Sequence, residues 1–484
     1  MSDSLKQTAT KSMFWAVGER FLTQGTLFII SLVLARILSP EDYGVLSLLL
    51  VFINLADVLV TNGLGEALIQ KNEPGKVDYG TIFVTGLAMS ILLYGLFFLA
   101  ADAIAAFYGM GQIGFYLRVL ALRLPFSALN AIQKAYIAKA FLFRKQFVAS
   151  TLGSLLSGAC AIGMALYGFG IYSLIAQQLL SIVLTSLIMA LQTKWLPQFA
   201  FSKQSFKALV PLGIQFCGAS LINSIYTEGR SLIIGKFYSA ADLAYFNRGN
   251  QFPSLVIGNL NAPISNVMLP VMCKVNGDKQ RLRSVLQKAI RLSSYLVFPM
   301  MAILAGCAPT LVTVLLTDKW SACVPYLQLG CIFFLFQPLQ TMNWQALKAM
   351  GEGACCLRLE IVKKVICFGL LFASIPFGVI GIAVASAVSG LFSMAVNIVP
   401  VKRLLNYGIK DQIWDIAKPA LASGVCFLIM LLIGKVDMAP VALLAVQLLA
   451  GLAVYILESV VFKLDGLAVI RGELHSKKAQ KDAA

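Results

Sequence analysis

Long apolar stretches alternate with short polar segments along the whole chain. Residues 80–101 and 441–461 are typical examples, since each is long enough to cross the hydrocarbon core of a bilayer as an α-helix. A transmembrane β-barrel would instead show segments of about ten residues with alternating polarity. Because helices satisfy their own backbone hydrogen bonds in lipid, the pattern predicts an all-α, polytopic membrane protein.

The pattern predicts fourteen membrane spans. They lie at residues 14–37, 43–62, 80–105, 116–140, 147–168, 171–191, 208–236, 242–272, 288–316, 323–349, 358–376, 379–403, 413–434 and 440–462. We expect a first lobe at 1–195, a second lobe at 196–405, an extra pair of spans at 406–464 and a polar cytoplasmic tail at 465–484. No small-residue cleavage site follows the first apolar segment, so we expect an uncleaved anchor.

Positive charges are distributed very unevenly over the predicted loops. With both termini in the cytoplasm, 30 of the 39 Lys and Arg residues fall in cytoplasmic ends and loops, 5 on the opposite side and 4 within spans. Cytoplasmic loops carry such an excess of positive charge. The distribution therefore favours an even number of spans, and it explains the net charge of +17 without nucleic-acid binding.

Composition excludes several functional classes. Only 13% of the residues are charged, compared with about 25% in soluble proteins. The ten cysteines include no CxxC pair, and the single histidine, His475, lies in the polar tail. Motifs of nucleotide hydrolysis, zinc proteases and serine hydrolases do not occur in the sequence. We therefore expect a transporter rather than an enzyme, with no cofactor and no metal.

Two pairs of segments indicate an internal duplication. Residues 35–44 (ARILSPEDYG) align without gaps with residues 235–244 (GKFYSAADLA), and each segment is a turn after an odd-numbered span. At an offset of 210 residues, the pair Tyr-Leu at 116–117 corresponds to Tyr-Leu at 326–327. Spans 1–6 and 7–12 are therefore predicted to be parallel repeats, an arrangement found in transporters.

Several predicted spans carry polar residues at helical spacing. The fourth span, for example, has Arg123, Ser127, Asn130 and Lys134 on one face. Such residues are costly in lipid unless they face a cavity or another helix, so they either line a cavity for sugars or hold helices together. The candidate cavity residues are Gln24, Ser127, Asn130, Asn223, Asn247, Gln251, Asn261, Gln337 and Gln340.

Charged residues within the spans form a second group of candidates. Arg20, Arg123 and Arg248 would bind a diphosphate through bidentate hydrogen bonds, and the alternative is that they pair with a carboxylate or reach the membrane surface. Asp57 and Glu228 are candidates for coupling transport to an ion. The alternative for these carboxylates is a salt bridge or a helix cap near the membrane surface.

Six segments of the sequence, taken together, indicate a family: residues 34–44, 55–57, 62–70, 259–270, 318–320 and 325–327. They resemble the polysaccharide transporter family of the multidrug/oligosaccharidyl-lipid/polysaccharide exporter superfamily. The resemblance extends over the first twelve spans, and it is closest to the lipopolysaccharide biosynthesis proteins of the colanic-acid-exporter type.

This resemblance implies two six-helix lobes around a central cavity, with access that alternates between the two sides of the bacterial inner membrane. The implied cargo is an undecaprenyl-diphosphate-linked oligosaccharide repeat unit, flipped from the cytoplasmic to the periplasmic leaflet. Related flippases hold the diphosphate with cationic residues on spans 1, 2 and 8. Arg20 and Arg248 match spans 1 and 8, whereas span 2 carries no arginine.

The expected partners are the polyprenyl-linked oligosaccharide, membrane lipid, and a polysaccharide polymerase with its assembly proteins. Two alternatives come from the same superfamily. A multidrug cation antiporter would need an acidic and aromatic cavity, whereas the charges within these spans are mainly cationic. A flippase for the peptidoglycan precursor is the second alternative.

Overall fold

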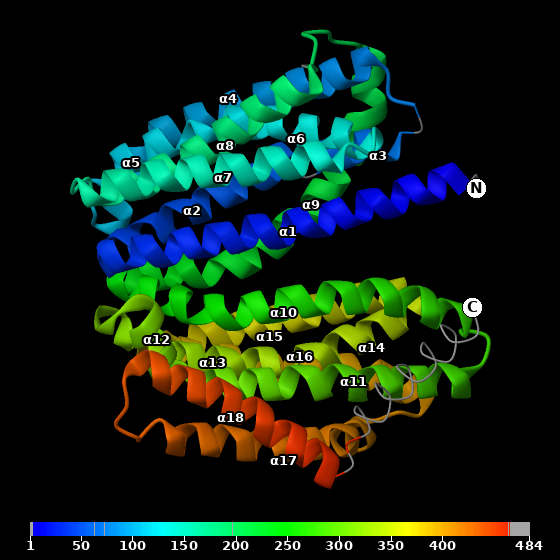
Figure 1. The fold of residues 1–484 in the computed structure, drawn as a ribbon. Coiled ribbons are helices and arrows are strands. Elements are labelled where there is room, and N and C mark those ends of the chain that lie inside the picture. Colours follow the sequence, from blue (N-terminus) through cyan, green and yellow to red (C-terminus); the bar gives the residue numbers. More distant parts are fainter. Residues whose placement is uncertain (1–2, 62, 72, 196, 463, 465–484) are drawn as a thin grey trace. The chain divides into compact units, whose positions relative to one another are not determined.

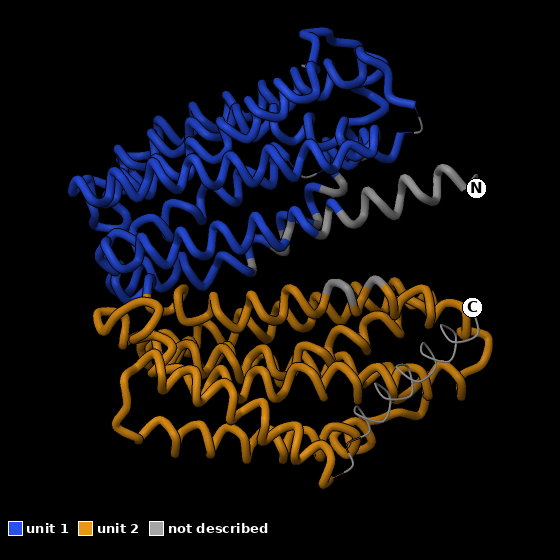
Figure 2. The backbone as a smooth tube through the Cα atoms, in the orientation of Figure 1, with its two compact units in different colours: residues 1–244 blue, residues 245–484 orange. Residues whose placement is uncertain are grey.

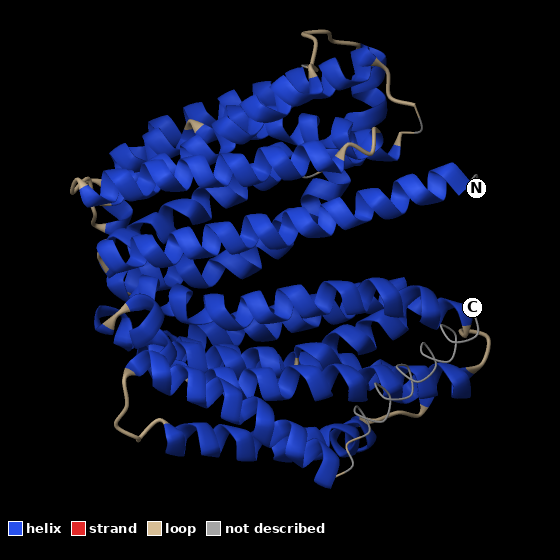
Figure 3. Cartoon of the chain, viewed as in Figure 1, coloured by secondary structure: helices blue, strands red, loops and turns tan. Residues whose placement is uncertain are grey.

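The computed structural model describes residues 3–61, 63–71, 73–195, 197–462 and 464. The side chains of Arg20 and Asn223 lie outside the described part, as does the predicted tail with His475. Within the described residues the chain forms α-helices and two short 3-10 helices and contains no strand (Figure 3). The predicted all-α fold is therefore confirmed.

The chain divides into two compact units, residues 1–244 and residues 245–484 (Figure 2). Unit 1 contains α1 (Asp3–Ile37), α2 (Pro40–Thr61), α3 (Leu64–Gln70), α4 (Lys76–Tyr108), α5 (Ile113–Ala121), α6 (Arg123–Lys139), α7 (Phe143–Leu166), α8 (Ile171–Thr193) and α9 (Lys203–Phe237) (Figure 1). The helix α9 packs against α2, α3 and α4 of this unit. The lobe boundaries expected from the repeat stay a prediction.

Unit 2 contains the remaining helices, and the first of them begins in the last residues of unit 1. They are α10 (Ala240–Lys274), α11 (Lys279–Gly306), α12 (Ala308–Leu316), α13 (Val324–Leu335), α14 (Gln337–Ala349), α15 (Gly353–Ser374), α16 (Gly378–Leu405), α17 (Ile409–Ile433) and α18 (Pro440–Val461), with short 3-10 helices at Asp318–Cys323 and Ile375–Phe377.

Ten segments of the described chain are long and apolar enough to cross a membrane. One of them, Gly353–Leu405, contains both α15 and α16. The helices α9 and α10 are 35 residues long and are not among the ten. The structure is therefore that of a multi-pass membrane protein, and the number fourteen stays a prediction.

Prolines explain why some predicted spans are two helices instead of one. Pro125 lies in the first turn of α6, and Pro309, Pro325 and Pro338 lie in the first turns of α12, α13 and α14. Proline has no backbone N–H and is best accommodated in the first turn of a helix, so these four residues favour the start of a new helix. Other prolines, such as Pro299 and Pro400, lie inside helices. The fourth predicted span is consequently divided between α5 and α6.

The helix packing in the two units follows one scheme. In unit 1, α6 contacts α4 and α8, and α7 contacts α8. In unit 2, α14 contacts α11 and α16, and α15 contacts α16. In chain order, α4, α6, α7 and α8 of unit 1 thus correspond to α11, α14, α15 and α16 of unit 2. This correspondence supports the duplication.

The two aligned turns also have the same local structure. The backbone N–H of Asp42 donates to Ser39 Oγ at 3.2 Å, and the N–H of Ser39 donates to Asp42 Oδ2 at 3.3 Å. The corresponding distances at Asp242 and Ser239 are 3.1 Å and 3.2 Å. This reciprocal arrangement is a capping box, which satisfies backbone donors at the start of a helix. It therefore explains the recurrence of Ser and Asp at the same spacing after 200 residues.

Gly44 at the start of α2 packs directly on the first residue of α10, Ala240. A Cβ atom on Gly44 would lie 1.7 Å from the carbonyl oxygen of Ala240, whereas one on Gly95 in α4 would meet no atom within 4 Å. We expect Gly44→Ala to lower the free energy of unfolding by about 2 kcal/mol, because the backbone must move apart. Thermal unfolding of the purified protein in detergent measures this, and equal stability of Gly44→Ala and Gly95→Ala would contradict it.

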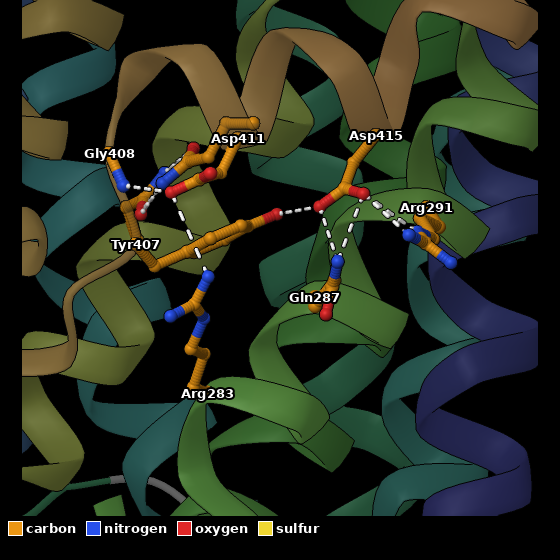
Figure 4. Close-up of polar contacts among 9 residues, drawn as sticks. Arg283, Gln287, Arg291, Tyr407, Gly408, Asp411 and Asp415 are labelled. Carbon is orange, nitrogen blue, oxygen red and sulfur yellow. Dashed lines mark hydrogen bonds and ion pairs between the residues drawn. The ribbon is translucent and has the colours of Figure 1, made fainter. Parts of the chain in front are cut away.

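A buried carboxylate joins α11 to α17 in unit 2 (Figure 4). Asp415 accepts hydrogen bonds from Gln287 Nε2 at 2.9 Å and from Tyr407 Oη at 2.5 Å, and Arg291 NH2 lies 2.6 Å from its Oδ1. Tyr407 lies between α16 and α17, and burial together with the hydrogen bond to Asp415 raises the pKa of its phenol. The phenol therefore keeps its proton and donates a hydrogen bond to Asp415 Oδ2.

Further polar contacts hold α17 and α18 within unit 2. Asn343 and Gln412 exchange two side-chain hydrogen bonds of 2.8 and 2.9 Å, and both residues are fully buried. The hydroxyl of Tyr455 donates to the carbonyl oxygen of Tyr295 at 2.8 Å. Both helices also pack on α11. The two C-terminal helices are therefore an integral part of this unit.

Candidate functional site

A polar pocket of about 460 Å³ lies within unit 1. Its polar lining comes mainly from α2, α3 and α6. The polar and charged residues that line it are Asp57, Thr61, Glu66, Arg123, Ser127, Asn130, Lys134 and Gln146. The four residues of the predicted stripe on the fourth span are all among them, so the helical spacing correctly identified one face of α6.

The pocket contains an ion pair between Asp57 and Arg123. Arg123 NH2 lies 3.2 Å from Asp57 Oδ2, and the two side chains are 16% and 18% exposed. Arg123 NH1 also donates to Gln178 Oε1 at 3.1 Å. Neither charge is therefore isolated, and Asp57 has the salt bridge that was the alternative to ion coupling.

Three polar atoms of this pocket are buried but make no hydrogen bond within the described structure. They are Asp57 Oδ1, Arg123 Nε and Ser127 Oγ. A buried polar group without a partner costs about 1–3 kcal/mol. The pocket thus retains hydrogen-bonding capacity for water or for a polar ligand.

Lys134 supplies the accessible positive charge of the pocket. Its side chain is exposed, and among the described residues it forms no hydrogen bond and no ion pair. The charged groups that act on it are Glu19, Asp57 and Arg123. The sequence pattern predicts Lys134 as part of the stripe but does not predict its role. The signal was its spacing, eleven residues after Arg123 on the same helix face.

Unit 2 contains a second polar pocket, of about 400 Å³. It is lined by Ser254, Ile257, Gly258, Asn261, Ser265, Phe334, Gln337 and Thr341. The carboxamide oxygen of Asn261 is buried and has no hydrogen-bond partner in the described structure. Two of the predicted cavity residues, Asn261 and Gln337, therefore lie in one pocket.

The two pockets occupy equivalent positions in the repeat. At the offset of 200 residues, Asp57, Thr61 and Gly65 correspond to Ile257, Asn261 and Ser265. At the offset of 210 residues, Ser127 and Ala131 correspond to Gln337 and Thr341. The offsets inferred from the two turns and from the Tyr-Leu pairs thus relate the linings of both pockets.

The chemistry of the two pockets differs strongly. Ile257 stands at the position equivalent to Asp57, Phe333 at that of Arg123 and Trp344 at that of Lys134. Among the described residues, the lining of the second pocket has no charged residue and offers amides, hydroxyls and apolar groups. The first pocket can bind an anion, whereas the second suits a neutral polar ligand.

Arg248 lies buried within unit 2. It is only 4% exposed, its NH1 donates to Gln251 Oε1 at 2.7 Å, and its guanidinium carbon lies 5.2 Å from the centre of the Trp320 ring. This environment is a cation–π contact with a hydrogen bond. Within unit 2, the structure brings Arg248 together with Gln251.

The other candidates have varied environments. Asn130 donates to Ser186 Oγ at 3.2 Å and Gln340 to the carbonyl oxygen of Gly390 at 3.0 Å, which are contacts that hold helices together. Glu228 accepts a hydrogen bond of 3.1 Å from Asn54. Gln24 is exposed and Asn247 is half-buried.

Comparisons with known proteins relate most of the chain to polysaccharide transporters. A family model described as "Polysaccharide biosynthesis protein" matches residues 33–325. The succinoglycan biosynthesis transport protein ExoT of Rhizobium meliloti is 24% identical, over 79% of this chain and 78% of that protein. The lipopolysaccharide biosynthesis protein WzxC of Escherichia coli is 23% identical, over 80% of this chain and 77% of that protein.

A solved structure has the same fold. The lipid II flippase MurJ, in an inward closed conformation, superposes with a TM-score of 0.76 at 16% sequence identity. The match covers 94% of this chain and 99% of that chain.

Proposed function

Because the chain belongs to the polysaccharide biosynthesis protein family, whose model matches more than half of it, we propose that it flips a lipid-linked oligosaccharide repeat unit across a membrane for the export of a surface polysaccharide. The relatives that it matches are named as transport and biosynthesis proteins of such polysaccharides. This family membership is the observation that carries the proposal. It agrees with the family that residues 34–70 predict.

The two pockets support a division of the cargo between chemically different sites. The diphosphate of an undecaprenyl carrier binds in the pocket of unit 1, where Lys134 is accessible and Arg123 offers an unpaired Nε. The sugars bind in the uncharged pocket of unit 2, where Asn261 and Gln337 hydrogen-bond their hydroxyls. Arg20 and Arg248 are the further cationic candidates for the headgroup.

Transport proceeds by alternating access. The protein lies in the bacterial inner membrane with both termini in the cytoplasm, and the cargo moves from the cytoplasmic to the periplasmic leaflet. Asp57 and Glu228 are the proposed residues for coupling to an ion, and a polysaccharide polymerase with assembly proteins receives the flipped unit. The uneven distribution of Lys and Arg supports this orientation.

The rival functions have different requirements. A cation antiporter would attract its substrates with acidic and aromatic groups. The pocket of unit 1 neutralises Asp57 with Arg123, exposes Lys134 as well as Glu66, and has no aromatic residue in its described lining. A peptidoglycan-precursor flippase would carry a diphosphate too. The glycan that accumulates in a deletion strain distinguishes this alternative.

Deletion of the gene is expected to leave the complete lipid-linked repeat unit on the cytoplasmic leaflet. The leaflet is scored by access of the glycan to an impermeant glycan-modifying enzyme added to intact spheroplasts, with lysed spheroplasts as the control for total glycan. Restoring the gene should return the glycan to the accessible side. Accumulation of lipid II would instead support the peptidoglycan alternative, and sensitivity to cationic drugs without any accumulated glycan would support the antiporter.

A further inference from the structure

Asp57 occupies one side of Arg123 in the way that a bound anion would. Its Oδ2 lies 3.2 Å from Arg123 NH2, and both side chains are largely buried. A guanidinium group binds carboxylate and phosphate oxygens through the same planar set of donors. A phosphate that enters the pocket of unit 1 therefore competes with Asp57 for Arg123.

The ion pair is incomplete, which leaves room for this competition. Arg123 Nε and Asp57 Oδ1 have no hydrogen-bond partner in the described structure, so the pair is not bidentate. On its other side, Arg123 NH1 is held by Gln178 Oε1 at 3.1 Å. The guanidinium thus keeps one anchor even when Asp57 is displaced.

Lys134 provides the second positive charge that a diphosphate needs. It lines the same pocket, its side chain is exposed, and it makes no ion pair within the described structure. Glu66 also lines the pocket and is exposed. Removing its charge therefore tests whether any loss of negative charge from the pocket strengthens anion binding. Asp57 differs from Glu66 in its direct contact with Arg123.

We propose that Asp57 is a built-in counter-anion, which occupies Arg123 between transport cycles and is displaced by the diphosphate headgroup that binds between Arg123 and Lys134. This inference rests on the proposed function. Each binding event then breaks one ion pair, and each release restores it. The headgroup is consequently held less tightly than two unpaired cations would hold it, which favours its release.

Binding of radiolabelled farnesyl diphosphate to the purified full chain in detergent tests the inference. Asp57→Asn keeps the shape of the side chain and removes its charge, so we expect about three- to tenfold tighter binding. Glu66→Gln removes one charge from the same pocket and should change the affinity less than about twofold. Lys134→Gln should weaken binding. In an Arg123→Gln background, Asp57→Asn should tighten binding by less than it does in the wild type, because only the field of Asp57 at Lys134 remains and the double-mutant cycle isolates the contact with Arg123.

Three results would overturn the inference: weaker or unchanged binding by Asp57→Asn, an equal gain in Glu66→Gln, or no binding of farnesyl diphosphate by the wild type. Asp57→Ser is a second variant in case Asp57→Asn does not fold, as judged by thermal unfolding. The proposed function is scored separately by the leaflet of the lipid-linked glycan. If the wild type flips the glycan but Asp57→Asn binds no more tightly, only the counter-anion is rejected.

Discussion

Replacement of Lys134 by glutamine is expected to lower polysaccharide export at least tenfold. Lys134 is the accessible cation of the unit 1 pocket, and a hydrogen bond to a charged group contributes about 1.5–3 kcal/mol, which corresponds to roughly a ten- to 100-fold change. Lys134→Arg keeps the charge and should retain most of the export. The deletion strain carrying each variant provides the measurement, as surface polysaccharide per amount of protein in the membrane.

Lys139→Gln is the matched control for this prediction. Lys139 lies on the same helix, but it donates to the carbonyl oxygen of Lys71 and does not line the pocket. The same chemical change there should leave export close to that of the wild type. Equal losses in Lys134→Gln and Lys139→Gln would show that the helix, rather than the pocket charge, is needed.

Replacement of Asp415 by alanine is expected to give the largest loss of stability, about 3 kcal/mol. The side chain of Asp415 is only 7% exposed, and its removal leaves Tyr407, Gln287 and Arg291 without their common acceptor. Tyr407 is itself fully buried, so its hydroxyl cannot reach water instead. In thermal unfolding of the detergent-purified protein, the apparent Tm should fall by roughly 5 °C or more.

Asp411→Ala is the control for Asp415→Ala. Asp411 lies one turn earlier on α17, its side chain is 47% exposed, and it is 3.8 Å from Arg283. Its carboxylate also accepts the backbone N–H of Gly408 at 3.0 Å, so its loss costs no more than about 1 kcal/mol. If both variants unfolded at the same temperature, the buried network would not be what joins α17 to α11.

Much of the architecture follows from local patterns in the sequence. The apolar segments identify the helices, and the spacing of Arg123, Ser127, Asn130 and Lys134 places them on one face because the period of an α-helix is fixed. The repeat offsets are also informative, since a duplicated fold puts equivalent residues at equivalent places. The two pockets follow these offsets.

The pairing of charges does not follow from the sequence. Asp57 and Arg123 are 66 residues apart, and nothing in their local patterns indicates that their helices bring them together. Arg291 and Asp415 are 124 residues apart in the sequence. Arg291 lies on α11, which begins at Lys279, nine residues before the predicted span 288–316. Tertiary packing decides these contacts. For the same reason, the burial of Arg248 against Trp320 was not foreseen.

The most direct measurement is transport by the purified protein alone. The protein is reconstituted into liposomes that contain a polyprenyl-diphosphate-linked oligosaccharide in both leaflets, and an impermeant glycan-modifying enzyme is added outside, under an imposed membrane potential and pH gradient. If the protein is a flippase, the modified fraction should rise from the outer half to nearly all of the glycan with the wild type. The rise should be at least tenfold slower with Lys134→Gln, and the fraction should stay at half in protein-free vesicles. If it stays at half with the wild type, the chain does not move this cargo.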